Sequence, residues 1–102
     1  MGLFDFLLGN NTAKIKDFQS RNCVIIDVRT KQEYVQGAIL ASKNIPLQNI
    51  NGKISEIKKL NKPVITCCAS GMRSGNAAGI LNSHGIETMN GGGWASLKNK
   101  LD

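Results

Sequence analysis

The fold is decided by the stretch from Val64 to Ser74, which reads Val-Ile-Thr-Cys-Cys-Ala-Ser-Gly-Met-Arg-Ser. Its first four residues are apolar or β-branched and follow Pro63, which is tolerated at the first position of a strand. The small residues that come next predict a tight loop. Helical spacing then continues to Gly85, a residue type typical of helix C-terminal caps. The stretch therefore predicts a buried strand, a short loop and a helix.

Two adjacent thiols, Cys67 and Cys68, lie where the predicted strand meets the loop. In open α/β sheets, ligands bind at the carboxyl ends of the strands. Backbone N–H groups of such a loop and of the following helix N-terminus bind anions and lower the pKa of a thiol. Arg73 adds a permanent positive charge, whose alternative roles are to cap the helix or to pair with an acid. We therefore predict Cys68 as the nucleophile and an anion-binding loop made of Ala69, Ser70, Gly71, Met72, Arg73 and Ser74.

Short apolar runs alternate with segments of helical period along the rest of the chain. Strands are predicted at 23–28, 44–45, 64–67 and 86–89, and helices at 13–19, 31–35, 50–57, 77–84 and 94–101. The three glycines at 91–93 are predicted to form a turn. This order indicates an α/β fold with a small, mainly parallel sheet and helices on both faces.

Four motifs resemble the rhodanese-like domain family, in that family's order. The loop from Cys68 to Ser74 resembles its active-site signature. The residues Ile26-Asp27-Val28-Arg29, with Glu33, Tyr34 and Gly37, resemble its first signature, and two shorter matches are Asn44-Ile45-Pro46-Leu47 and Gly92-Gly93-Trp94. One departure is Ala38, where the family often has histidine.

The resemblance implies a rhodanese-like fold and a thiosulfate sulfurtransferase-like activity. Cys68 would carry a sulfane sulfur as a persulfide, taken from a small anionic donor such as thiosulfate and passed to cyanide or a thiol. It also implies that Asp27 and Arg29 support the active-site region, or form a structural pair. No metal and no organic cofactor are implied.

Two other interpretations stay open. Counted from Cys67, the loop has the Cys-x5-Arg-Ser spacing of cysteine-dependent phosphatases and arsenate reductases, although no histidine precedes Cys67. The shorter loop from Cys68 favours sulfur over a larger tetrahedral phosphate. In the second interpretation, the domain is a non-catalytic module that carries sulfur for a protein partner or docks on it.

Length and composition set the remaining expectations. The 102 residues suffice for one domain, which we place at residues 12–102 after an apolar segment, 1–11, where Leu3, Phe4, Leu7 and Leu8 suit a short amphipathic helix. The segment is too short to span a membrane. Thirteen basic against seven acidic residues give a charge of +6, but scattered lysines and few aromatics argue against nucleic-acid binding. Three cysteines without a metal-ligand pattern indicate a reducing compartment, hence a cytoplasmic location.

Overall fold

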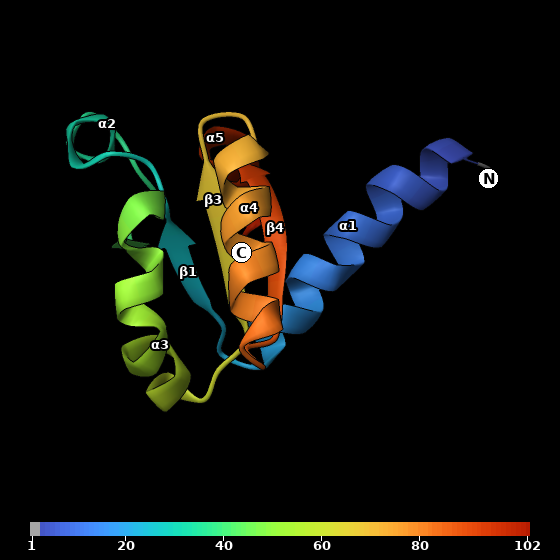
Figure 1. Ribbon diagram of the computed structural model, residues 1–102. Helices are drawn as coiled ribbons and strands as arrows, with labels where there is room; N and C mark the ends of the chain where they lie inside the picture. Colours follow the sequence, from blue (N-terminus) through green and yellow to red (C-terminus); the bar gives the residue numbers. More distant parts are fainter. Residues whose placement is uncertain (1–2) are drawn as a thin grey trace.

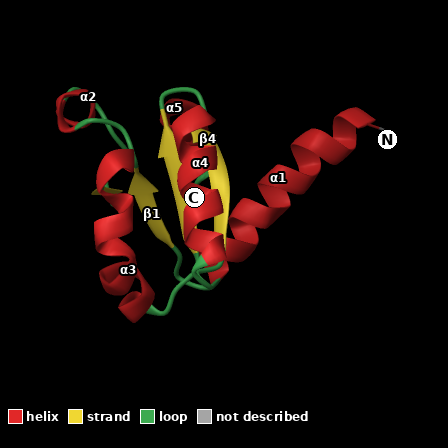
Figure 2. Ribbon diagram, viewed as in Figure 1, coloured by secondary structure: helices red, strands yellow, loops and turns green. Residues whose placement is uncertain are grey.

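The computed structural model describes residues 3–102, with side chains from residue 11 onward. The helices and strands form a layered α/β domain (Figure 1; Figure 2). Their order along the chain is α1 (Leu3–Ser20), β1 (Val24–Asp27), α2 (Lys31–Val35), β2 (Lys43–Asn44), the 3-10 helix η1 (Leu47–Lys53), α3 (Ile54–Leu60), β3 (Val64–Cys68), α4 (Met72–Ser83), β4 (Thr88–Gly93) and α5 (Trp94–Lys100).

The sheet has four parallel strands in the order β2-β1-β3-β4. The central strand β3 pairs with β1 from Val24↔Val64 to Asp27↔Cys67, so the carboxyl ends of these two strands lie side by side. All five residues of β3 are buried, as their uninterrupted apolar character predicts. The loop that follows β3 therefore begins at the carboxyl edge of the sheet, between the neighbouring strands β1 and β4.

Helices cover both faces of the sheet. On one face, side chains of η1, α3 and α4 pack against the strands; the fully buried members of this cluster include Ile50, Ala77 and Leu81. On the other face, α1 and α5 contribute Ile15, Phe18 and Leu97 to a second cluster. The predicted fold class, an α/β domain with a small parallel sheet between helical layers, is confirmed.

Strand β4 differs from the prediction. It begins at Thr88 rather than at Ile86, and it runs through the three glycines that we expected to form a turn. A Cβ atom on Gly91 would lie 2.7 Å from Ile65 Cγ2 and 2.9 Å from the Thr66 carbonyl oxygen. Only glycine at position 91 allows β4 to approach β3 this closely, so Gly91 is a packing requirement rather than a turn signal.

Helix α1 is also longer than predicted. A helix was expected at 13–19 after a separate apolar segment, whereas one continuous helix runs from Leu3 to Ser20. Its carboxyl half anchors it through Ile15 and Phe18, and its amino half extends away from the sheet (Figure 1). The predicted apolar face of residues 3–8 lies outside the described side chains. No described helix is long and apolar enough to cross a membrane.

Candidate active site

The thiol of Cys68 lies at the end of β3, inside the loop that leads to α4. Its Sγ accepts a hydrogen bond from the Gly71 N–H at 3.0 Å and one from the Ser74 N–H at 3.3 Å. The Ser74 hydroxyl lies 3.3 Å from the same sulfur. Gly71 has a φ of +104°, a backbone conformation that glycine adopts without strain, and this turn aims its N–H back at the sulfur. The loop thus surrounds the Cys68 thiol with hydrogen-bonding groups.

These contacts decide the charge of Cys68. Burial raises its pKa, because the charged form loses solvent. The Ser74 hydroxyl and the N–H groups of Ser74, Gly71 and Ser70 act in the opposite direction, and together they outweigh burial. The pKa of Cys68 is therefore lowered below that of an ordinary thiol, which favours the nucleophilic thiolate.

The neighbouring thiol, Cys67, has a different environment. Successive strand residues point to opposite faces, so its side chain enters the cluster packed by α1 and α5, where the residue is fully buried. Burial raises the pKa of Cys67 to about 12, and the nearby Asp27 carboxylate acts in the same direction. Cys67 is therefore a neutral core residue in this structure, whereas Cys68 faces the loop amides.

Asn90 on β4 fixes the two residues that serve Cys68. Its Nδ2 donates to the Gly71 carbonyl oxygen at 2.9 Å, and its Oδ1 accepts from the Gly92 N–H at 2.9 Å and from the Ser74 hydroxyl at 2.7 Å. Because the Ser74 hydroxyl has one proton, Asn90 and Cys68 share or compete for it. Sequence reasoning missed this residue, since Asn90 falls outside every motif.

The other predicted loop residues have distinct positions. Ser74 is fully buried beneath Cys68, whereas Ala69 and Ser70 are exposed and Met72 is 84% exposed. A Cβ atom on Gly93 would lie 2.8 Å from the Ala69 carbonyl oxygen, so β4 packs directly under the loop. Ala69, Ser70 and Met72 therefore form the outer surface of the loop.

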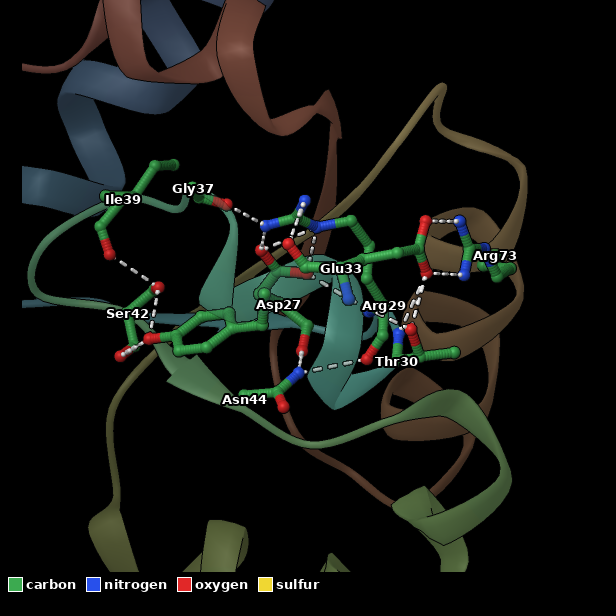
Figure 3. Close-up of polar contacts among 10 residues, drawn as sticks. Asp27, Arg29, Thr30, Glu33, Gly37, Ile39, Ser42, Asn44 and Arg73 are labelled. Carbon is green, nitrogen blue, oxygen red and sulfur yellow. Dashed lines mark hydrogen bonds and ion pairs between the residues drawn. The ribbon is translucent and has the colours of Figure 1, made fainter.

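Arg73, predicted to contact substrate, makes a two-pronged ion pair with Glu33 of α2. Its Nη1 and Nη2 lie 2.8 and 3.0 Å from the two carboxylate oxygens (Figure 3). Pairing with an acid was one of the alternatives left open by the sequence. The Arg73 guanidinium and the Thr30 N–H stabilise the carboxylate and lower the pKa of Glu33 to about 2.

Asp27 and Arg29 form a buried pair beneath α2. Arg29 donates to Asp27 through Nε and Nη2, the latter at 2.7 Å (Figure 3). The Arg29 guanidinium also lies over the Trp94 ring, 4.7 Å from its centroid. It also donates to the carbonyl oxygens of Gly37 and Glu33. These contacts tie β1 to α2, the helix that carries Glu33.

Comparison with known proteins places this architecture in a family. The Rhodanese-like domain family model matches residues 11–100. The chain belongs to the rhodanese-like domain family. A Schizosaccharomyces pombe protein, provisionally named a mitochondrial thiosulfate sulfurtransferase, is 33% identical over 99% of this chain and 80% of its own length. This rhodanese-like chain is therefore of a sulfurtransferase-type family.

Two further proteins are similar to the rhodanese-like chain. The uncharacterized protein YqhL of Bacillus subtilis is 40% identical over 64% of this chain, and the chain spans about half, 51%, of that protein. A solved structure of a rhodanese-like domain protein from Staphylococcus aureus has a TM-score of 0.70 at 30% identity, covering 85% of this chain and 86% of that one. Both the sequence and the fold thus agree with the family assignment.

Proposed function

We propose that this rhodanese-like domain is a sulfurtransferase that carries sulfane sulfur as a persulfide on Cys68. The observation that supports this most directly is the pair of backbone N–H groups at 3.0 and 3.3 Å from Cys68 Sγ, with the Ser74 hydroxyl beside them. Donors fixed in this way stabilise the thiolate before attack and an anionic persulfide after it. A thiosulfate-like donor and a cyanide or thiol acceptor are part of the proposal.

The proposed reaction has two steps. In the first, the Cys68 thiolate attacks the outer sulfur of thiosulfate; the new S–S bond forms as the S–S bond of the donor breaks, and sulfite leaves with its electron pair. In the second, cyanide or a thiolate attacks the outer sulfur of the persulfide anion and regenerates the Cys68 thiolate. Neither step requires a general base, a metal or an organic cofactor. Because Cys68 is only 1% exposed, the exposed loop residues move aside to admit the donor.

Arg73 is the proposed docking group for the donor's oxyanion. It supplies the only charged side chain between Cys68 and Ser74, and guanidinium groups bind oxyanions through two parallel hydrogen bonds. The alternative use of Cys67 as a phosphatase nucleophile has less support, because that thiol is fully buried and its pKa is raised to about 12. The three free thiols support a reducing, cytoplasmic location.

Mass spectrometry after thiosulfate treatment tests the proposal. One added sulfur atom is expected on the peptide that contains Cys68, and cyanide should release it again. The variant Cys68→Ser should lose both the added sulfur and sulfur transfer, whereas the matched variant Cys67→Ser should keep both. Sulfur on Cys67, or an active Cys68→Ser protein, would overturn the assignment. A stable persulfide without turnover would contradict the enzymatic part and identify a sulfur carrier.

A further inference from the structure

We propose that Glu33 determines which sulfur donors the site accepts, by competing with anionic donors for Arg73. The inference deepens the proposed function and rests on it. Glu33 disfavours donors with two negative charges, such as thiosulfate, relative to donors with one charge or none, such as persulfides of neutral thiols. Glu33 is thus a residue that sets specificity without contacting the reacting sulfur.

The competition follows from the geometry of the ion pair. Both terminal nitrogens of Arg73 are used by the two oxygens of Glu33, at 2.8 and 3.0 Å. An oxyanion binds a guanidinium in the same two-pronged manner, so a donor that binds this Nη1–Nη2 edge requires the N–H groups that Glu33 occupies. No other charged side chain is present from Cys68 to Ser74 to bind the donor instead.

Glu33 is held in place independently of Arg73. Its Oε1 accepts from the Thr30 N–H at 3.0 Å, and its own N–H donates to the Thr30 hydroxyl at 3.2 Å, which is a capping box at the start of α2. Its carbonyl oxygen accepts from Arg29, which is anchored on the buried Asp27. The carboxylate is therefore ordered beside Arg73 before any donor arrives.

The charge of Glu33 is permanent near neutral pH. Hydrogen bonds from Arg73 and from the Thr30 N–H hold its pKa at about 2, so the carboxylate does not become neutral under ordinary conditions. A dianionic donor must displace this carboxylate and then remains close to its charge. A singly charged persulfide experiences less repulsion and, since its reactive sulfur carries the charge, depends less on Arg73. Glu33 therefore weakens the binding of thiosulfate relative to that of persulfides.

The test is the variant Glu33→Gln. Glutamine also serves at this position of a capping box, so α2 keeps its cap while the charge is removed. We expect the KM for thiosulfate to fall by about two- to fivefold with kcat unchanged, a size typical of exposed ion pairs. The KM for the persulfide of 2-mercaptoethanol should stay the same. Glu56→Gln is the control, because it makes the same change in net charge on α3, where Glu56 pairs with Lys53.

Two outcomes contradict the proposal. A higher or unchanged KM for thiosulfate would show that Glu33 orients Arg73 for binding instead of competing for it. An equal fall in Glu56→Gln would show a general effect of net charge.

Direct binding of thiosulfate separates this inference from the sulfur-transfer proposal. Calorimetry should show that thiosulfate binds more tightly to the double variant Cys68→Ser with Glu33→Gln than to Cys68→Ser alone. This result is expected even if the wild-type protein transferred no sulfur, because binding to Arg73 does not require the thiol. Equal or weaker binding to the double variant would overturn the competition itself.

Discussion

Replacing Ser74 by alanine should make Cys68 a weaker nucleophile without unfolding the domain. The hydroxyl lies 3.3 Å from Cys68 Sγ, and it is one of the groups that lower the pKa of that thiol. Alanine keeps the backbone N–H that also donates to the sulfur, so the variant isolates the contribution of the hydroxyl. Asn90 Oδ1 keeps the Gly92 N–H as a partner at 2.9 Å, so this acceptor is not left without a donor.

The expected size follows from the strength of the lost contact. A hydrogen bond to a charged group contributes about 1.5–3 kcal/mol, and the lower end applies because Asn90 shares the Ser74 proton. The acid dissociation constant of the Cys68 thiol should therefore fall by about tenfold. The sign is fixed by the donor: without it the thiolate is less stable, and ionisation moves to higher pH.

The assay is the rate of iodoacetamide alkylation of Cys68 between acidic and alkaline pH, read by mass spectrometry of the peptide. The Ser74→Ala profile should shift to higher pH, whereas Ser70→Ala, the same change at an exposed position of the loop, should match the wild type. An unchanged Ser74→Ala profile would contradict a role of the hydroxyl in the ionisation of Cys68. It would mean that the Ser74 hydroxyl donates only to Asn90 and that the backbone N–H groups alone stabilise the Cys68 thiolate.

Two further predictions concern stability. Asp27→Ala leaves the Arg29 guanidinium buried without its partner, which should destabilise the domain by about 3–5 kcal/mol and lower its melting temperature by more than about 12 °C; a melting temperature within a few degrees of wild type would contradict a structural role. Gly91→Ala should cost about 1–3 kcal/mol in denaturant unfolding, because its Cβ would meet Ile65 at 2.7 Å, whereas Gly79→Ala, with open space around it, should be neutral or stabilising. Equal effects at the two glycines would argue against the close packing of β4.

Much of the fold could be predicted because its decisive signals are local. The apolar runs around Ile26 and Ile65 specify the two central strands, and the helix predicted at 31–35 is α2. Helix α4 ends at Ser83 with Gly85 in the left-handed conformation, as a glycine after helical spacing indicates. Each of these signals lies within a few residues of the structure that it specifies.

The errors concern contacts between distant segments. Glycine is usually depleted in strands, so the extension of β4 through the three glycines could be recognised only by knowing that Gly91 packs against Ile65. The ion pair between Glu33 and Arg73 joins residues on different helices, and no local sequence pattern predicts it. Asn90 acquires its role through hydrogen bonds to Ser74 and Gly71, which lie 16 and 19 residues before it in the chain. Contacts of this kind depend on the folded arrangement and produce no periodic pattern in a single sequence.

The opposite orientation of the two adjacent thiols has a consequence for the fate of the sulfur. Cys67 cannot reach around the strand to its neighbour, and Cys23 precedes β1, at the far end of the parallel sheet from Cys68. The described chain contains all three cysteines, so it holds no internal thiol that could discharge a loaded Cys68. Under the proposed function, a persulfide on Cys68 would therefore need an acceptor from outside the described chain, and the supply of that acceptor would set how long the domain stays loaded.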